Sequence, residues 1–430
     1  MPPKTNKIRK SLIVSFWDGI FASAMSGFVT DYITPYALAL KATVRQIGVL
    51  SALPFLASSL AQLQSADIAE RVGNRKKTIC FFVFLHAVML VPMILTPFLF
   101  KGNPVIFLIL FFTLYTGFNT LVGPVWSDLM CEYVPARKRG SYFGWRNKIM
   151  SIVVIGASLT AGIILQAFGQ KSLAGFAVIL SIALACRLVS IYFLTRMYEP
   201  RFTVHRGAYF SIIDFIRTMR HSNFGRFVLF IAGMQFCVNL AAPFFSVFML
   251  RDLQFSYITY TVLVATVTAV QIFTMGRWGR CADRTGTLKV LKVTALVIAT
   301  LPLWWLVSRN PAYLFFIQIL GGFVWSGFNL CTTNFVYDAV TPQKRIRCLG
   351  YLNVFVGMAV FLGGLIGGQL ATIMPPVLGY KLLSLFCISS ILRFLVLWLI
   401  VGTIKEVRPI DTMKTKDMLL GVVGLGPLDR

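Results

Sequence analysis

Twelve long apolar segments constrain this chain more than any other feature of its sequence. A helix needs about 20 apolar residues to cross a hydrocarbon core about 30 Å thick. Each segment is therefore predicted to be a transmembrane helix, and no alternation of apolar and polar residues predicts a β-barrel. The segments run over residues 11–37, 44–66, 78–100, 104–130, 141–168, 174–197, 224–250, 256–276, 289–308, 311–338, 349–374 and 378–404.

Composition and charge agree with a membrane protein. Hydrophobic residues make up 57% of the 430 residues and charged residues only 13%, whereas a soluble domain carries about 25% charged residues. The net charge of +26 would raise the question of nucleic acid in a soluble protein. Here the basic residues stand in short clusters between apolar runs, so nucleic-acid binding is excluded and lipid contact is expected.

The placement of the basic residues predicts the orientation. With both chain ends in the cytoplasm, the N-terminal tail, the even-numbered connections and the C-terminal tail hold most of the 41 Lys and Arg residues. This bias predicts an N-in, C-in protein of a bacterial inner membrane, or of a vesicle membrane derived from it. The first apolar run continues past Tyr32 and is expected to be an uncleaved span. The opposite connections hold seven basic residues: Lys41, Arg45, Lys101, Lys171, Arg251, Arg309 and Lys381.

The two halves of the chain repeat one another. Residues 66–77 (ADIAERVGNRKK) and 279–289 (GRCADRTGTLK) share an acidic–basic–x–Gly pattern followed by a base. Pro135 and Pro342 lie 207 residues apart, and Arg187 and Arg393 lie 206 apart. Three agreements of this kind indicate a tandem duplication of a six-span unit. The loop residues concerned are Glu70, Arg71, Gly73 and Arg75, and then Asp283, Arg284, Gly286 and Lys289.

The duplication predicts the domain organisation of an all-α membrane protein. One six-helix bundle is expected over 1–197 and another over 224–404. Residues 198–223 would join them through an amphipathic helix on the cytoplasmic surface, and residues 405–430 would form a cytoplasmic tail. Gly73 and Gly286 are expected to adopt positive φ, because the chain must reverse between two helices in few residues.

These loops resemble the signature of the major facilitator superfamily, G-x-L-A-D-R-x-G-x-[RK]-[RK]. The second copy is the better match, since the first has Ala66 for the leading Gly and Glu70 for the Asp. The resemblance implies two six-helix bundles that carry a small solute between them, with these loops gating the cytoplasmic side. Acids at neighbouring helix ends are expected to be salt-bridge partners of Arg71 or Arg75: Asp128, Glu132 and Asp338.

A narrower resemblance and one rival function remain open. Residues 17–19 (WDG), 238–253 and 337–345 resemble a group of bacterial permeases of magnetosome membranes, which would imply iron transport and magnetite biomineralisation. A non-transporting receptor or scaffold on the same fold is the other alternative. Multidrug efflux is disfavoured, because span four lacks an arginine and span five lacks a Gly-Pro motif.

In the major facilitator superfamily, which this chain resembles, spans one, four, seven and ten line the central cavity. Each of these four spans carries polar residues here. Hydroxyl and small residues also serve helix packing in lipid, but amides need a partner when they are desolvated. The candidates for the solute cavity are Asp31, Tyr115, Asn119, Gln235, Asn239, Trp325 and Asn329.

Charges inside spans are costly, so they are expected to face a cavity or a partner. Asp18 and Asp31 are candidates to carry a coupling proton or to meet a cation. Alternatively, Asp18 is an interfacial carboxylate beside a basic loop, and Asp31 is a gate or interface residue. Arg187 and Arg393 occupy equivalent positions, which favours a structural clamp over anion binding.

No cofactor or enzyme chemistry is expected. The eight cysteines form no CxxC pair, and His86 is the only histidine in a span, so no metal site is predicted. No phosphate-binding GxxxxGK[ST] loop occurs, which disfavours ATP as the driving force. Neither a Ser–His–Asp set nor an HExxH motif is present, so the chain is predicted not to be an enzyme.

Overall fold

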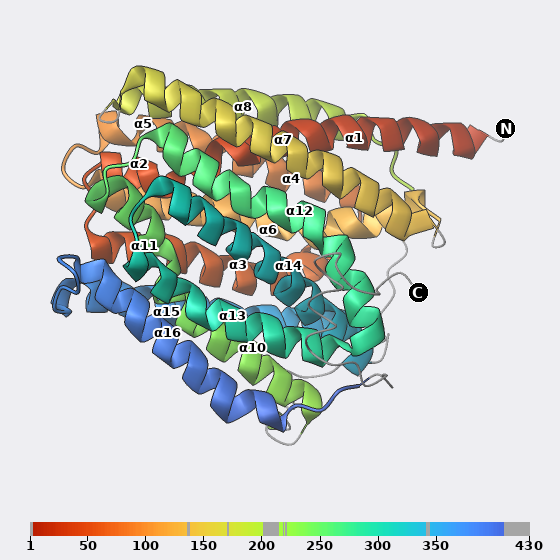
Figure 1. Cartoon of the computed structure of the whole chain (residues 1–430). Coiled ribbons are helices and arrows are strands. Elements are labelled where there is room, and N and C mark those ends of the chain that lie inside the picture. The colour runs from red at the N-terminus through yellow and green to blue at the C-terminus, as the bar shows by residue number, and fades with distance from the viewer. Residues whose placement is uncertain are drawn as a thin grey trace. The chain divides into compact units, whose positions relative to one another are not determined.

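The computed structural model describes residues 3–135, 138–169, 172–200, 215–217, 219, 222–340 and 345–407. Twelve helical spans within them are long and apolar enough to cross a membrane, which confirms the predicted number. The described residues contain no β-sheet, apart from one isolated bridge between Val377 and Tyr380. The chain is thus all-helical, as Figure 1 shows.

The first six spans form one series of helices. They are α1 (Pro3–Val29) with α2 (Ile33–Ala39), α3 (Val44–Val72), α4 (Arg75–Val88) with α5 (Leu90–Leu99), α6 (Pro104–Tyr133), α7 (Arg139–Phe168) and α8 (Leu173–Thr195). The last six are α10 (Asn223–Asn239) with α11 (Ala242–Val247) and the π-helical η2 (Phe248–Asp252), α12 (Tyr257–Thr285), α13 (Thr287–Val307), α14 (Pro311–Ala339), α15 (Arg345–Ile373), and α16 (Lys381–Ile400) with η3 (Val401–Thr403).

Helix packing repeats in the two halves. Span one packs on spans five and six (α1 on α7 and α8), and span seven packs on spans eleven and twelve (α10 on α15 and α16). Span three packs on spans four and six (α4 on α6 and α8), and span nine packs on spans ten and twelve (α13 on α14 and α16). Four equivalent pairings confirm the tandem repeat that the sequence motifs predict.

The chain divides into two compact units. One comprises Met1–Arg206 with Pro243–Ala265, and the other comprises Gly207–Ala242 with Thr266–Arg430. The end of span seven and the start of span eight thus group with the first unit. The predicted bundles 1–197 and 224–404 remain predictions, and most of the predicted linker 198–223 and tail 405–430 lies outside the described residues.

Glycines permit close helix contact at the repeated pairings. A Cβ on Gly27 of α1 would lie 2.5 Å from the carbonyl oxygen of Val154 in α7. A Cβ on Gly363 of α15 would lie 2.5 Å from the carbonyl oxygen of Phe236 in α10. In lipid, where apolar burial does not drive helices together, such close backbone contact is a main source of association.

The first span of each half is interrupted at an equivalent place, which the sequence did not reveal. Between α1 and α2 the helix is broken at residues 30–32, and between α10 and α11 it is broken at residues 240–241. A proline stands in the first turn of the following helix in both cases, Pro35 in α2 and Pro243 in α11. Proline has no N–H to continue the ladder but fits a first turn, so it favours a new helix start.

Candidate functional site

The loop between α3 and α4 has the predicted backbone. Gly73 has φ 67°, and its counterpart Gly286, between α12 and α13, has φ 89°. The prediction of positive φ at both glycines is therefore confirmed. After the first reversal, the side chain of Asn74 accepts a hydrogen bond of 2.8 Å from the N–H of Lys77 and caps α4.

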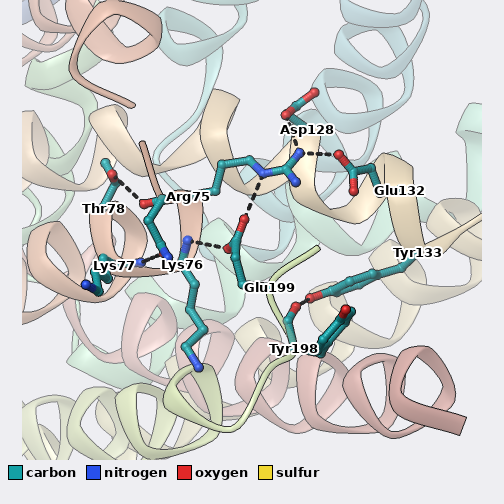
Figure 2. Close-up of polar contacts among 10 residues, drawn as sticks. Arg75, Lys76, Lys77, Thr78, Asp128, Glu132, Tyr133, Tyr198 and Glu199 are labelled. Atoms are coloured by element: carbon teal, nitrogen blue, oxygen red, sulfur yellow. Dashed lines mark hydrogen bonds and ion pairs between the residues drawn. The ribbon is translucent and has the colours of Figure 1, made fainter. Parts of the chain in front are cut away.

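Arg75, the first residue of α4, joins three carboxylates, as Figure 2 shows. Its Nη1 lies 2.8 Å from Oδ2 of Asp128 and 2.6 Å from Oε1 of Glu132, and its Nε lies 3.2 Å from Oε1 of Glu199. The Arg75 side chain is only 2% exposed, whereas that of Asp128 is 60% exposed. The guanidinium is thus a buried hub for acids that are partly open to solvent. This set, Arg75 with Asp128, Glu132 and Glu199, is called the Arg75 cluster below.

The helices explain why these acids meet one cation. Asp128 and Glu132 are four residues apart on α6, so they share a helix face. Glu199 follows the end of α8, and its Oε2 also accepts a 2.8 Å hydrogen bond from the N–H of Lys76. The acid therefore lies at the N-terminus of α4, where the helix dipole favours negative charge.

The structure pairs two of the three predicted acids, Asp128 and Glu132, with Arg75 rather than with Arg71. Arg71 is exposed and forms no ion pair within the described part of the chain. The side chain of Glu70 lies outside the described residues. Of the two predicted partners, Arg71 and Arg75, it is therefore Arg75 that binds these acids.

Sequence reasoning missed Glu199, although the repeat contained a signal for it. Glu199 precedes Arg201 by two residues, and Glu406 precedes Arg408 by two, 207 residues further on. In the second half, Oε2 of Glu406 accepts a 2.7 Å hydrogen bond from the N–H of Leu288, near the start of α13. The two glutamates therefore perform the same capping role in both halves.

In the second loop, the residue at the position of Arg75 is apolar. At the offset of 213 residues, the counterpart of Arg75 is Leu288. Asp338, on α14, accepts a 3.3 Å hydrogen bond at Oδ2 from Oγ1 of Thr287. The predicted loop residues Asp283 and Arg284 are exposed at the end of α12. The two loops thus share the positive φ and the capping glutamate, and Leu288 stands where the first loop has Arg75.

Asp18 belongs to a polar chain buried inside the first bundle. Its Oδ1 accepts a 2.6 Å hydrogen bond from Ser190 of α8, whose hydroxyl also accepts from Nη1 of Arg187 at 3.3 Å. Nε of Arg187 donates to Nδ1 of His86 at 3.1 Å, and Nη2 donates to Oδ1 of Asn119 at 3.2 Å. Asp18 is therefore held by helices rather than by a basic loop, against one of its predicted alternatives.

Further residues extend this chain. His86 stacks on Tyr115 with ring centroids 3.9 Å apart, and the Tyr115 hydroxyl contacts the sulfur of Met25 at 2.8 Å. Arg146 of α7 donates to the carbonyl of Ser15 at 3.2 Å and lies near enough to Asp18 to stabilise its charge. Tyr115 and Asn119, predicted to line a cavity, thus share one buried network with Asp18, and Asn119 remains exposed on one side.

Asp31 stands at the break between α1 and α2, in a different setting. Its Oδ2 accepts a 2.8 Å hydrogen bond from the hydroxyl of Ser158 in α7, and its backbone carbonyl accepts one of 2.8 Å from Tyr260 in α12. The neighbouring Tyr32 hydroxyl lies 2.6 Å from Oγ1 of Thr261. The carboxylate thus accepts from a hydroxyl group rather than from a cation, and the residue is half-buried.

The other predicted cavity residues lie in the second half. Asn239, the last residue of α10, donates to the carbonyl of Gln235 at 2.8 Å, directly before the break in span seven. Trp325 of α14 packs edge-to-face on Phe328, and Asn329 is exposed. Of these four predicted cavity residues, Gln235 and Asn239 thus lie beside a helix break.

Arg393 differs from its counterpart Arg187. It is buried in α16, where Nη1 donates to the carbonyl of Ile298 at 2.9 Å, and Nε has no hydrogen-bond partner among the described residues. Within the same part of the chain it forms no ion pair with a carboxylate. The hydrogen bond from Arg393 to a neighbouring helix fits the predicted clamp. Its guanidinium has no acidic partner among the described residues, whereas Arg187 is linked to Asp18 through Ser190.

This difference predicts opposite effects of the same substitution. Removing one partner of a buried polar network costs about 3–5 kcal/mol, whereas replacing an uncompensated buried charge by an apolar side chain is often neutral or stabilising. We expect Arg187→Met to lower the melting temperature of the purified protein in detergent and Arg393→Met to leave it unchanged or raise it. Equal losses in both variants would contradict this interpretation of the two arginines.

The described residues contain no group of three or more His, Cys, Asp or Glu side chains placed to hold a metal ion. His86, the only histidine in a span, is engaged by Arg187 and Tyr115 instead.

Comparison with known proteins agrees with this architecture. The family model of the Major Facilitator Superfamily matches residues 16–242 and 227–420. An uncharacterised MFS-type transporter of Methanocaldococcus jannaschii is 20% identical over 393 residues, which cover 89% of this chain and 96% of that protein.

Two solved structures show the same fold. A crystal structure of a mutant of the nucleoside transporter NupG has a TM-score of 0.74 at 12% identity, covering 92% of this chain and 100% of that one. A crystal structure of a D-xylose-proton symporter has a TM-score of 0.68 at 11% identity, covering 91% of this chain and 97% of that one. Together with the twelve spans and the duplicated loops, the family match leads to one conclusion: the chain belongs to the major facilitator superfamily.

Proposed function

We propose that this chain is a secondary active transporter that moves a small polar solute across a bacterial inner membrane by alternating access. The observation that carries the proposal is the equivalent break in spans one and seven. A broken helix leaves backbone groups without their usual partners, which a bilayer tolerates only where they face protein or a water-filled cavity. Breaks at the same place in two repeats are therefore expected beside a solute site at mid-membrane.

The polar residues near the breaks support this placement. Asp31 lies within the break of span one, and Asn239 and Gln235 lie directly before the break of span seven. Carboxylate and amide groups can orient a polar solute through hydrogen bonds. In this proposal both chain ends are cytoplasmic, and the Arg75 cluster stabilises the cytoplasmic end of the first bundle.

Of the two predicted coupling carboxylates, we favour Asp31 as the proton carrier. A carrier must exchange its proton with water during the cycle, and Asp31 is half-buried with hydroxyl neighbours. Asp18 is buried and bonded to Ser190, which links it to Arg187 within one network. Asp18 therefore serves structure, and Asp31 is the better group for coupling.

The test is uptake by proteoliposomes with an imposed pH gradient. Solutes are first selected by thermal stabilisation of the purified protein, beginning with nucleosides and pentoses because structurally similar proteins carry them. We expect Asp31→Asn to abolish gradient-driven accumulation and to retain exchange of labelled solute at equal pH on both sides. The amide keeps the shape of the side chain but cannot release a proton.

Asp252→Asn is the matched control, since it removes one carboxylate from a pair with Arg251, whose side chain is 45% exposed. A pair that is open to solvent on one side is worth little. Accumulation by Asp31→Asn with the pH dependence of the wild type would reject Asp31 as the carrier. Failure of the wild-type protein to transport any solute that stabilises it would reject secondary transport and favour the receptor alternative. The iron alternative has no observation of its own in its favour, since no ligand group for a metal ion is found in the described residues.

A further inference from the structure

A surface groove lies at one end of the second bundle, between the start of α10 and the end of α16. It has a volume of about 540 Å³ and is lined by Arg226, Leu229, Leu399, Ile400, Gly402 and Lys405, among others. The groove is remote in sequence from the breaks and from the Arg75 cluster, and the proposed transport mechanism does not use it.

Two basic residues lie at the rim of this groove. Nη1 of Arg226, in the first turn of α10, donates to the carbonyl of Thr403 at 3.1 Å. The backbone of Lys405 is held by two hydrogen bonds of 2.8 Å with the side chain of Asn223, one in each direction. None of the described residues that line the groove is acidic, so this lining favours an anion.

The wall of the groove is apolar and continues the lipid-facing surface of α16. Leu399 is 55% exposed, and Trp398 beside it is 80% exposed. One and two turns earlier on the same helix, Leu395 and Ile391 are also exposed. Such residues on a membrane-spanning helix face acyl chains, and tryptophan is enriched at the level of the lipid head groups. The groove therefore begins where the lipid-facing surface of α16 reaches the level of the lipid head groups.

Gly402 keeps the groove open. A Cβ at this position would meet no atom within 4 Å, and the residue is not in the left-handed region of φ. A larger side chain would consequently fit the backbone and project into free space. This offers a way to fill the groove without changing its charge.

We propose that this groove binds the head group of an anionic phospholipid, with Arg226 and Lys405 holding the phosphate and an acyl chain lying along Leu229 and Leu399. Basic pockets between transmembrane helices on the cytoplasmic side, where this end is predicted to lie, recognise such head groups. A soluble anion would use the two cations but not the apolar wall, and a zwitterionic lipid would use the wall but less of the charge. The combination of both favours an anionic lipid.

The experiment measures lipid binding to the full-length protein purified in detergent. Phosphatidylglycerol, cardiolipin or phosphatidylcholine is added, and retained lipid is counted by native mass spectrometry while melting temperature is recorded. We expect one anionic lipid to be retained by the wild type, and the double variant Arg226→Gln/Lys405→Gln to bind it about tenfold or more weakly, because each basic residue near the membrane surface contributes about fivefold.

Gly402→Phe tests the groove independently of charge and of the Arg226–Thr403 contact, and we expect the same loss of retained lipid. The matched control is Arg277→Gln/Arg280→Gln, which removes two exposed arginines of α12 at the same predicted side. Unchanged lipid retention in Gly402→Phe or in the double variant would overturn the proposal. So would equal retention of phosphatidylcholine, or displacement of the lipid by inorganic phosphate at equal concentration.

Discussion

Asp18→Asn is expected to lower the melting temperature of the detergent-purified protein by roughly 6 °C or more. Asparagine can still accept the hydrogen bond from Ser190, which lies 2.6 Å from the carboxylate. It cannot supply the negative charge that compensates Arg187 and Arg146 inside the bundle. Because removing one member of a buried charged group leaves the others without compensation, the folded state is destabilised.

A double variant separates this effect from a change in packing. Combining Asp18→Asn with Arg187→Met removes the carboxylate and one of the cations that it compensates. We expect the loss in the double variant to be smaller than the sum of the two single losses, which is the mark of a direct interaction. Additive losses would show that Asp18 and Arg187 do not stabilise one another.

Arg75→Gln is expected to reduce solute uptake at least tenfold. The substitution removes charge-assisted hydrogen bonds to Asp128, Glu132 and Glu199, each of which contributes about 1.5–3 kcal/mol. Three carboxylates near the ends of α6 and α8 then lose their common cation and repel one another, and α4 keeps only contacts that do not involve the guanidinium, such as the bond from the Lys76 N–H to Glu199. A change of about 1.4 kcal/mol in the gating equilibrium is already tenfold.

Peptide-resolved maleimide labelling supplies a second measurement that needs no solute. Cys131 lies next to Glu132 on α6 and is half-buried, so loosening of this end should increase its labelling. Lys77→Gln is the matched control, since its side chain is exposed and its backbone bond to Asn74 is retained. If Arg75→Gln transported at the control rate with unchanged labelling of Cys131, the Arg75 cluster would not be a gate element.

Three single variants together distinguish the roles assigned to the charged groups of the first bundle. Asp18→Asn should affect thermal stability first, whereas Asp31→Asn should affect coupling and leave stability near that of the wild type. Arg75→Gln should affect uptake even when the protein remains folded. A receptor or scaffold on this fold would lose stability in Asp18→Asn but show no uptake to lose in the other two.

Several features of the fold could be predicted because they follow from local sequence. Apolar segments of sufficient length become spans wherever they occur, since the backbone must satisfy its own hydrogen bonds in lipid. Gly73 and Gly286 signal positive φ by residue type alone, because few other residues adopt it easily. Asp128 and Glu132 share a helix face by their spacing, so their pairing with a nearby arginine could be anticipated.

Other features depended on residues that are distant in the chain. Glu199 joins Arg75 from 124 positions away, and only the repeat offset, compared with Glu406, could have indicated it. His86 and Asn119 meet Arg187 from two other helices. Their residue types showed that each needed a polar partner, but not which one.

The sequence by itself determined the membrane class, the number of spans, the duplication and the family, because these depend on hydrophobicity and on motifs that each occupy a few consecutive residues. Only the tertiary structure decided that Arg75 rather than Arg71 holds the acids, that Asp18 is enclosed while Asp31 stands at a helix break, and that Arg187 and Arg393 differ in their partners. The physical reason is that a charge in a low-dielectric bundle takes its properties from groups within a few ångströms. Helix packing, not chain order, decides which groups those are.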